Sequence, residues 1–431
     1  MLDKETRDRI IALIHKEVVP AIGCTEPMAV ALATARAKEA LGSLPESIDV
    51  LLSANILKNA MGVGIPGTGM IGLPIAVALG ACIGRSEYQL EVLRDLTPDS
   101  LAEGKLYMQQ HDINIKQKEG IAEKLYIEIT CHAADGKQSK AIISGSHTRF
   151  IYIENADGKV ELEDNCDFPT SSEEDDIRLN LKMVHEFATE APLNEIMFIL
   201  QTKDYNMKAA QNAIEGNYGH NLGKTIDRPL AKGIFGNSIF SHIIAKTASA
   251  CDARMGGAMI PVMSNSGSGN QGICATNPVV VYAIENENTE EELVRALTLS
   301  HLTAIYIKQS LGKLSALCGC VVASIGSSCG ITYLMGGDYQ RVCHSVKNMI
   351  ANLTGMICDG AKPSCALKIS SGVSTAILSA LLSMEGKCVT SAEGIIDDDV
   401  DKSIHNLTSI GADAMRATDD MVLNIMTHKG C

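Results

Sequence analysis

A change in hydrophobic period divides this 431-residue chain into three parts. Residues 3–42 carry apolar positions at helical spacing, and the pattern is helical again from Ile177 to the end. Between these parts, five segments show the β-branched, alternating pattern of strands, with ADGK turns between several of them. They are SIDVLLS, DINIKQK, EKLYIEITCHA, SKAIISG and RFIYIE. Strands enclosed by helical sequence predict a small α/β unit inserted into a helical one.

We therefore predict an α+β fold with two domains. The mostly helical domain comprises residues 1–45 and 175–431, and the inserted α/β domain comprises residues 46–174. The insertion ends in an acidic linker, ELEDNCDFPTSSEEDD, whose charges favour solvent. A Gly-rich apolar stretch, residues 60–84, is expected to be a loop that leads into a helix.

The apolar content predicts helices that pack closely through small residues. Hydrophobic residues make up 46% of the chain, but aromatic residues only 4%, and Gly (37) and Met (18) are frequent. Residues 314–337 carry no charge and resemble a membrane span in length. They contain five Gly, four Ser and three Cys, which suit a buried helix or helix pair better than a lipid-facing one.

Charge and cysteine usage narrow the class of protein. A formal charge of −14 argues against a nucleic-acid partner, because phosphate binding needs clustered Lys and Arg. The first 20 residues form a charged amphipathic pattern without the apolar core of a signal peptide, and no membrane partner is expected. We expect a cytoplasmic protein whose 14 cysteines are thiols or metal ligands.

Three cysteines in the last third are the first candidate site. Cys318, Cys358 and Cys365 follow C-x39-C-x6-C and sit among Gly, Ser and Ala. Three thiolates are one short of a closed tetrahedral site, so a metal group held this way keeps a position open for substrate. The same region also holds Cys320, Cys329 and Cys343. Spacing does not choose among the six, and buried apolar cysteines are the alternative.

The second candidate is Cys24, in AIGCTEPMAVALATARA. It falls at the start of a predicted helix, where Thr25 can cap and Pro27 suits the first turn. Backbone N–H groups and the helix dipole are expected to lower the pKa of a thiol at that position. An ordinary buried cysteine is the alternative.

The third candidate is the uncharged segment MSNSGSGNQGICATNP, residues 263–278. Its small side chains, hydroxyls and amides form a loop that opens a helix and offers backbone N–H groups to a carboxylate or phosphate. A tight turn between helices is the alternative, but its buried polar side chains would each need a partner. The candidate binding residues are Ser264, Asn265, Ser266, Gly267, Ser268, Gly269, Asn270 and Gln271.

Two other patterns carry less weight. Residues 62–67 match GxGxxG, but the preceding NILKNAM is helical rather than a strand and a Pro interrupts the motif, so we reject a dinucleotide site. A pyridoxal-phosphate enzyme needs a Schiff-base lysine, and nothing distinguishes Lys246, Lys308 or Lys313.

Four segments together resemble the L-cysteine desulfidase family, which is related to the iron–sulfur-dependent bacterial L-serine dehydratases. They are GCTEPMAVALA, GVGIPGTGMIGLP, SNSGSGNQG and the C-x39-C-x6-C set, and they span nearly the whole chain. The resemblance implies a [4Fe-4S] cluster held by Cys318, Cys358 and Cys365, with one iron lacking a cysteine ligand. It implies Cys24 as the base and the 264–271 loop as the carboxylate site. It also selects Cys318 over Cys320.

The implied reaction is elimination of hydrogen sulfide from L-cysteine to give pyruvate and ammonia, with the open iron as Lewis acid. Serine dehydratases space the last two cluster cysteines more widely and carry a His where this chain has Cys24, which favours cysteine over serine. L-serine or L-threonine dehydration is the nearest alternative. A metal- or ligand-binding regulatory protein is the alternative from another class.

The expected partner is a small amino-acid substrate, and a homodimer is left open as the oligomeric state. In some serine dehydratases a C-terminal cysteine reaches the open iron when substrate is absent. Cys431 ends this chain, and the same role is one expectation for it, with a frayed tail as the alternative.

Overall fold

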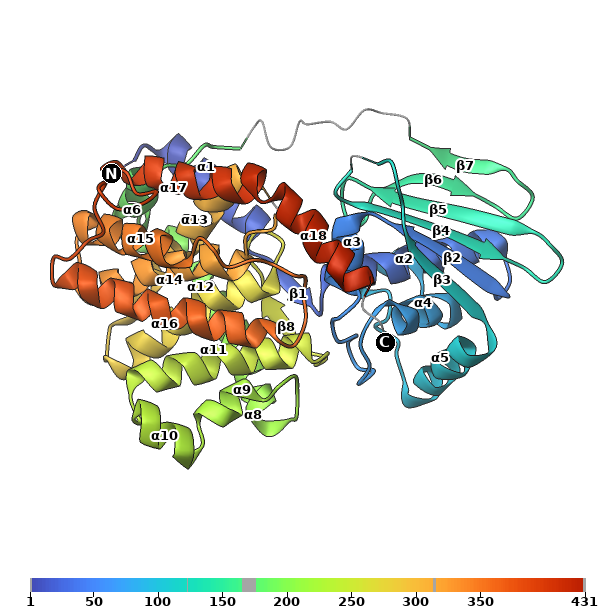
Figure 1. Ribbon diagram of the computed structural model, residues 1–431, viewed down its shortest axis with the longest axis horizontal. Helices are drawn as coiled ribbons and strands as arrows, with labels where there is room; N and C mark the ends of the chain where they lie inside the picture. Colours follow the sequence, from blue (N-terminus) through green and yellow to red (C-terminus); the bar gives the residue numbers. More distant parts are fainter. Residues whose placement is uncertain (1, 122, 165–175, 313–314, 429–431) are drawn as a thin grey trace.

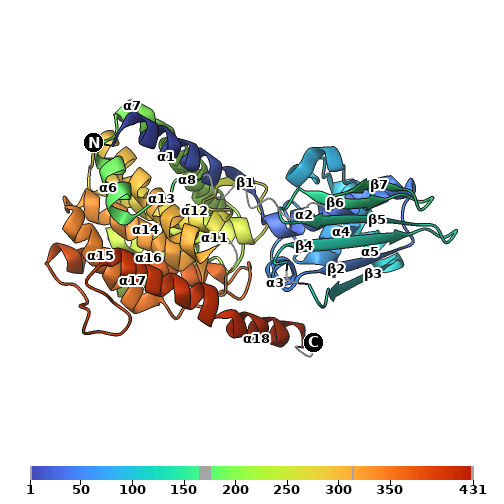
Figure 2. The same ribbon diagram turned by 90° about the horizontal axis from the view of Figure 1, so that it is seen from above.

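The computed structural model describes residues 2–121, 123–164, 176–312 and 315–428, and it has two lobes (Figures 1 and 2). We call residues 25–164 the sheet lobe, and residues 2–24 with 176–428 the helical lobe. This arrangement confirms the predicted α+β fold with a mostly helical part.

The sheet lobe is built on a six-stranded mixed sheet with the order β3-β2-β4-β5-β6-β7. In this sheet β2 and β3 are parallel, and the remaining neighbours are antiparallel. The strands are β2 (Ser47–Leu52), β3 (Asp112–Gln117), β4 (Tyr126–His132), β5 (Gln138–Ser144), β6 (Phe150–Glu154) and β7 (Val160–Glu163). All five predicted strands are confirmed, whereas β7 was not predicted.

Helices cover one face of this sheet. They are α2 (Thr25–Leu41), α3 (Ala54–Ala60), α4 (Leu73–Cys82), the 3-10 turn η1 (Ser86–Glu91) and α5 (Pro98–Gln110). Ile48, Val50 and Leu52 of β2 are buried toward the helices, while the alternate residues of the strand are partly exposed. This period-2 burial is typical of a sheet with one covered face, and it is what the sequence pattern predicted.

The boundary between the two lobes lies earlier than the predicted residue 45. Helix α2 packs on α4, β4 and β5, and Met28, Val30 and Leu32 belong to the same hydrophobic core as the sheet. Its residues therefore belong with the α/β unit and not with the helical part. The helix is apolar on nearly all sides, so its own pattern does not say which lobe it covers.

The helical lobe surrounds the buried helix α14 with α12, α13, α15 and α16. Its helices are α1 (Lys4–Glu17), α6 (Leu181–Glu190), α7 (Leu193–Ile196), α8 (Gln201–Glu215), α9 (Leu222–Ile226), α10 (Pro229–Phe235), α11 (Ile239–Met255), α12 (Gly269–Glu285), α13 (Glu290–Leu311), α14 (Gly319–Leu334), α15 (Tyr339–Leu353), α16 (Cys365–Met384), α17 (Val400–Ser409) and α18 (Arg416–Thr427), with the short turns η3 (Met197–Leu200) and η4 (Ile410–Ala414). Every residue of α14 except Gly319 and Tyr333 is buried, which confirms the predicted buried helix. A Cβ on Gly326 would overlap the Ser300 carbonyl oxygen, so small residues allow the close approach.

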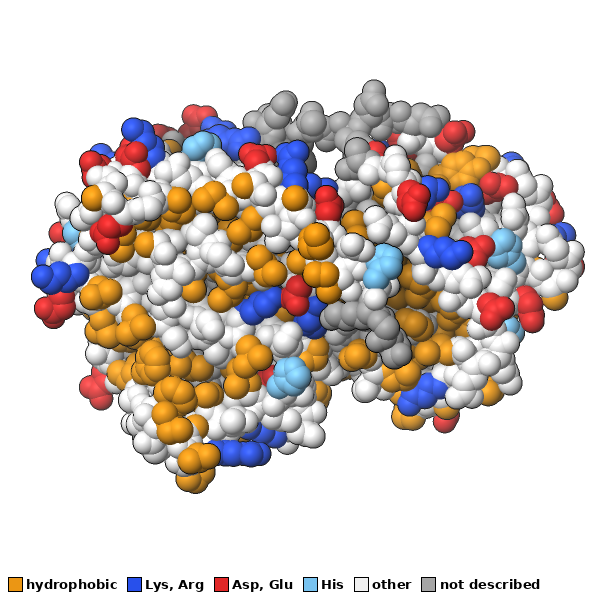
Figure 3. All heavy atoms as spheres, viewed as in Figure 1, with side chains coloured by type: hydrophobic (Ala, Val, Ile, Leu, Met, Phe, Trp, Pro, Cys, Tyr) orange, Lys and Arg blue, Asp and Glu red, His pale blue; other side chains and the backbone are white. Residues whose placement is uncertain are grey.

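One described helix, α16, is long and apolar enough to cross a membrane by length and composition, and 56% of its apolar window is buried inside the protein. It packs on α11, α14 and α15, which is the position of a core helix. Its outer surface carries Leu367, Leu378, Leu381 and Leu382, each about half exposed, and Figure 3 shows apolar side chains gathered over this helix.

The two lobes meet beside a strand pair of the helical lobe and along helix α18, besides the chain crossings. Strand β1 (Pro20–Ile22) pairs antiparallel with β8 (Pro261–Met263), directly before Cys24 and the 264–271 loop. Helix α18 runs from the helical lobe to α3 of the sheet lobe, and Leu423 enters the sheet-lobe core (Figure 2). These contacts position the candidate site at the junction between the lobes.

Candidate functional site

The β1–β8 pairing brings Cys24 and the candidate loop to the same place. Beyond the paired strands, the Ser264 N–H donates to the Val19 carbonyl oxygen (2.8 Å), and the Ser266 N–H donates to that of Glu17 (2.9 Å). The segment that leads to Cys24 therefore lies directly beside the loop, although the two are 240 residues apart in the sequence.

The GVGIPG segment is a contact between the lobes. A Cβ on Gly64 would lie 2.6 Å from the Gly257 nitrogen, and the Gly64 N–H donates to the Met255 carbonyl oxygen (3.0 Å). The segment follows α3 rather than a strand, which confirms that it is not a dinucleotide fingerprint. Gly64 is needed because two backbones touch here.

Cys24 is the N-cap residue of α2 and is buried where the cores of the two lobes meet. Its thiol donates a hydrogen bond to Oε2 of Glu26 (2.8 Å). Burial and the negative charge of Glu26 raise the pKa of Cys24 well above its usual range, and the Arg254 charge opposes them only in part. The prediction that the helix N-terminus lowers this pKa is therefore wrong. At neutral pH Cys24 is a thiol, and the Glu26 carboxylate accepts its hydrogen bond.

The side chains at the start of the candidate loop are paired within the protein. The Ser264 hydroxyl donates to the Val19 carbonyl oxygen (2.6 Å), and the Ser266 hydroxyl donates to Oδ1 of Asn265 (2.8 Å). Ser268 is the N-cap of α12, where its hydroxyl accepts from a backbone N–H of the first turn. These side chains hold the loop in shape, and the loop opens a helix as the sequence predicted.

A neutral histidine supports the loop from behind. Nδ2 of Asn265 donates to Nδ1 of His301 (3.0 Å) and to its carbonyl oxygen (3.1 Å), and Nε2 of His301 lies 3.0 Å from the Thr276 hydroxyl. That hydroxyl donates to the Gly272 carbonyl oxygen, so Nε2 is the protonated nitrogen. Burial lowers the pKa of His301 to about 3, which keeps the ring neutral.

The end of the loop, in the first turn of α12, contacts a guanidinium group and a thiol. Oδ1 of Asn270 accepts from Nη1 of Arg254 (3.1 Å), and the thiol of Cys251 lies 3.7 Å from the same oxygen. The side chain of Gln271 lies against Gly319, since a Cβ there would be 2.9 Å from the Gln271 Cδ atom. Gln271 therefore contacts the residue that follows Cys318.

The structure brings Cys318 and Cys358 together through an isolated β-bridge between Leu317 and Ile357. The Cys358 N–H donates to the Ala316 carbonyl oxygen (2.6 Å), and the Cys318 N–H donates to the carbonyl oxygen of residue 356 (3.0 Å). Two cysteines that are 40 positions apart thus stand side by side at the start of α14 and in the turn before α16.

Cys365 begins α16, and its thiol lies 3.7 Å from the Gly360 carbonyl oxygen. Burial raises its pKa to about 11, and the charges that Cys358 and Cys318 would carry add to this effect. The three cysteines of the sequence pattern are thus mutual neighbours. Cys320 lies beside Cys318 and raises its pKa more than burial does, and Cys274 and Cys251 are further thiols of the same neighbourhood.

Three lysines surround these thiols. Lys58 and Lys368 each act to lower the pKa of Cys358. The charges that Cys358 and Cys318 would carry act to raise the pKa of Lys308. Lys58 pairs with Asp419 of α18, and a Cβ on Gly360 would overlap the Lys58 carbonyl oxygen. Burial nevertheless raises the pKa of Cys358 overall, and the charges of Lys58 and Lys368 oppose that rise only in part.

These donors fit a cluster better than a single ion. Within the described ranges, no three His, Cys, Asp or Glu side chains converge on one ion position. In an iron–sulfur cluster each cysteine binds a different iron, so the thiolates need only face a common space. Three neighbouring thiols, soft ligands with lysines around them, are a donor set that suits such a cluster.

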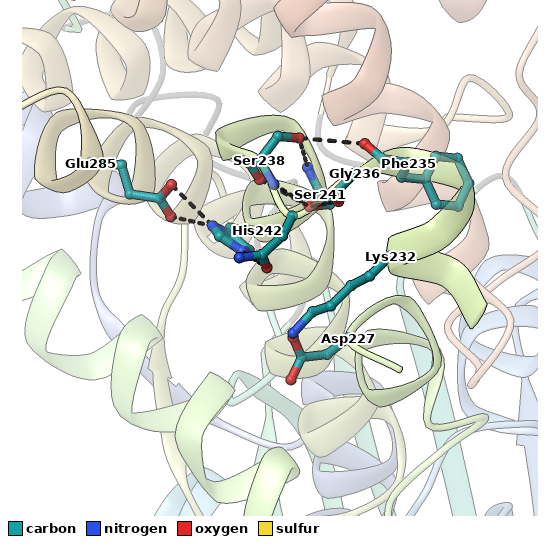
Figure 4. Close-up of polar contacts among 9 residues, drawn as sticks. Asp227, Lys232, Phe235, Gly236, Ser238, Ser241, His242 and Glu285 are labelled. Atoms are coloured by element: carbon teal, nitrogen blue, oxygen red, sulfur yellow. Dashed lines mark hydrogen bonds and ion pairs between the residues drawn. The ribbon is translucent and has the colours of Figure 1, made fainter. Parts of the chain in front are cut away.

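A hollow of about 590 Å³ lies elsewhere on the helical lobe, between α9, α10, α11 and α12. Figure 4 shows two polar pairs there: His242 lies 2.8 Å from Glu285, and Asp227, which lines the hollow, lies 2.8 Å from Lys232. Ser238 caps α11 in the same region. Lys246 lines this hollow, away from the cysteines, so it gains no support as a catalytic lysine.

Several residues of the site were not predicted. Lys58 is a single charge in apolar sequence, and that isolation is the signal that sequence reasoning could have used, whereas Arg254 lies two residues after Asp252 and carries no such signal. Glu26 lies inside the GCTEP motif, two residues from Cys24, and its contact with the thiol depends on the side-chain rotamer. Cys431 and Lys313 lie outside the described residues.

Comparison with known proteins gives a family match and full-length relatives. The family described as "Serine dehydratase alpha chain" matches residues 87–424, which include the loop and the three cysteines but not Cys24. UPF0597 proteins of Bacteroides thetaiotaomicron and Phocaeicola vulgatus are each 65% identical to this chain, over 430 and 432 residues and over the full length of both chains. A UPF0597 protein of Shewanella halifaxensis is 43% identical over 430 residues, covering 96% of this chain and 97% of its own.

Proposed function

Because the chain belongs to the serine dehydratase alpha chain family, we propose that it is an iron–sulfur-dependent lyase that eliminates hydrogen sulfide from L-cysteine. The products would be pyruvate and ammonia. What supports this proposal is that the first turn of α12 contacts both Arg254, whose charge acts on Cys24, and Gly319, which follows Cys318 in the group of three neighbouring cysteines.

Cys318, Cys358 and Cys365 would hold the cluster, and Lys58, Lys308 and Lys368 would offset its negative charge. When bound, a [4Fe-4S] cluster with one iron free of cysteine supplies a Lewis acid that makes the β-substituent a better leaving group. The residues of the chain then have to bind the amino acid and move its α-proton.

Cys24 is the base in this proposal, and Glu26 is the group that accepts its proton, although burial and the Glu26 charge raise the pKa of the thiol. The Cys24 thiol already donates to Oε2 of Glu26, so the proton can pass to the carboxylate and leave a thiolate. Arg254 is close enough to stabilise that thiolate electrostatically. Burial disfavours the thiolate because it raises the pKa of the thiol, but the thiolate is a stronger base when it forms.

The electron balance of the elimination is simple. The Cys24 thiolate takes the Cα proton, the Cα–H electron pair forms the Cα–Cβ double bond, and the Cβ–S bond breaks with its pair leaving as hydrosulfide. The resulting aminoacrylate tautomerises to an imine, and water then releases ammonia and pyruvate. No electron is gained or lost by the protein.

L-serine dehydration is the second candidate, and the family match favours it, because the matched family takes its description from serine dehydratase. The same residues serve both reactions, since only the leaving atom differs. The Cys24 sulfur in place of a histidine base favours cysteine.

The test is anaerobic purification followed by iron and sulfide analysis and parallel assays with L-cysteine and L-serine. We expect pyruvate from L-cysteine with equimolar sulfide. Cys24→Ala should retain iron and the broad visible absorbance but lose turnover. Wild-type pyruvate formation in that variant, or absence of iron from the wild-type protein, would refute the proposal.

Matched cysteine variants test the ligand set. Cys358→Ser and Cys365→Ser should lose most of the iron, whereas Cys329→Ser, in the buried middle of α14, should keep it. Cys320→Ser tests the choice between neighbouring thiols and should also keep the iron. Equal iron content in Cys358→Ser and Cys329→Ser would remove the cluster assignment.

A further inference from the structure

Arg254, in the last turn of α11, is a buried cation that meets no counter-anion among the described residues. It is 4% exposed, and its Nη1 donates a hydrogen bond to Oδ1 of Asn270 (3.1 Å). Its Nε has no hydrogen-bond partner, and no carboxylate in the described part of the chain lies within ion-pair distance of it. The nearby Asp252 carboxylate instead accepts from the backbone N–H groups of His220 and Gly223.

A charge removed from water is costly unless an opposite charge replaces the water. Arginine is especially suited to carboxylates, because its planar fork can donate two parallel hydrogen bonds. A buried, unpaired guanidinium is therefore the expected form of an anion site that lacks its anion.

The surroundings of Arg254 favour an anion as well. Its side chain lies against Gly269, where a Cβ would overlap Nε, so it sits at the N-terminal turn of the 17-residue helix α12. Free N–H groups and the helix dipole add positive potential at that end. The Arg254 charge also acts on the thiol of Cys24 and lowers its pKa in part.

A second unpaired polar group lies close by in the first turn of α12. Gln271 is buried, and its Oε1 has no hydrogen-bond partner among the residues that the structure describes. Its side chain lies between the first turn of α12 and Gly319, next to Cys318. A buried carbonyl oxygen without a donor is suited to a positively charged N–H group.

We propose that Arg254 binds the α-carboxylate and Gln271 Oε1 the α-ammonium group of a free α-amino acid. This assignment rests on the proposed function and names the groups that hold its substrate. It narrows the expectation that the 264–271 loop binds the carboxylate, because the hydroxyls of Ser264 and Ser266 are already paired within the protein. It also limits the substrate to free amino acids, since a peptide or ester lacks one of the two charges.

The test measures binding rather than turnover. Full-length protein carrying Cys24→Ala, purified anaerobically, is titrated calorimetrically with L-alanine, propionate and ethylamine. Arg254→Gln should weaken binding of both L-alanine and propionate at least tenfold. Gln271→Leu should weaken L-alanine at least tenfold and leave propionate unchanged. Arg85→Gln, at an exposed position of the sheet lobe, is the control and should change neither.

Two further variants keep the test informative if Arg254→Gln folds poorly. Arg254→Lys keeps the charge and should retain part of the affinity, and Gly269→Ala should weaken both acids by displacing the guanidinium. Equal affinity for L-alanine in the parent and the Arg254 variants would overturn the proposal, as would a parent that binds no L-alanine. If the Cys24→Ala protein binds L-alanine but the wild-type protein forms neither sulfide nor pyruvate from L-cysteine, the proposed reaction is refuted and this assignment stands.

Discussion

The ion pair between Lys58 and Asp419 ties α18 of the helical lobe to α3 of the sheet lobe, and its loss should destabilise the protein measurably. The Lys58 side chain is 3% exposed and that of Asp419 23%. Asp419→Asn keeps the shape of the side chain but removes its charge. In this variant the positive charge of the buried Lys58 ammonium group has no carboxylate from Asp419 to compensate it.

Breaking a buried pair from one side typically costs about 3–5 kcal/mol. Because water reaches Asp419, we expect the lower end, about 3 kcal/mol. The entropy of unfolding is about 2.1 cal/mol/K per residue, or roughly 0.9 kcal/mol/K for this chain length. The midpoint of thermal unfolding should therefore fall by about 3 °C in Asp419→Asn.

Differential scanning calorimetry of three variants measures this effect. Asp413→Asn is the matched control, because its pair with Arg416 is 70% and 77% exposed and should contribute less than about 1 kcal/mol. The double variant Lys58→Met/Asp419→Leu should recover most of the loss, because no buried charge remains. If Asp419→Asn lowers the midpoint no more than Asp413→Asn does, the argument for a buried tie between the lobes is refuted.

Three other predictions follow from the site. His301 has a pKa of about 3 in the folded protein and about 6.5 in the unfolded chain. Between these values only the unfolded chain binds the proton. The free energy of unfolding therefore falls by about 1.4 kcal/mol for each pH unit as the pH is lowered from about 6.5 toward 3. His301→Gln should show a pH slope of stability smaller by one proton in that window, and an unchanged slope would contradict the neutral histidine. Gly272→Ala places a methyl group on a backbone carbonyl oxygen of β8 and should lower the midpoint of thermal unfolding. Gly233→Ala, on α10, has no atom near the added methyl group and should leave the midpoint unchanged. Equal midpoints in the two variants would disprove the close contact at Gly272. Glu26→Gln removes the acceptor for the Cys24 proton and should lower kcat by about 10²–10⁴-fold with the iron content unchanged; wild-type kcat would exclude that role.

Much of the fold could be predicted because it follows from local patterns. The alternation in SIDVLLS predicts a strand with one buried face, and Ile48, Val50 and Leu52 are that face. The uncharged, small-residue sequence around Ser324 and Gly326 predicts the buried helix α14. Neither prediction depends on which elements pack against the strand or the helix, because burial alone sets the hydrophobic pattern.

The partners of α2 and the electrostatics of the site could not be predicted in the same way. Helix α2 is apolar on nearly all sides, so only packing shows that it covers the sheet. A helix N-terminus predicts a lowered pKa for Cys24, but burial and Glu26 reverse the direction. Both effects depend on where other side chains lie.

By itself, the sequence determined five strands of the sheet, the buried helix α14, the loop that opens α12, and the residue types that could perform the chemistry. Tertiary structure alone decided that β1 pairs with β8, that Cys24 meets Glu26, and that Arg254 is buried with no carboxylate of the described residues beside it. The physical reason is range. Backbone preference and hydrophobic period act between near neighbours in the chain, whereas desolvation and charge depend on every group within a few ångströms, whatever its position in the sequence.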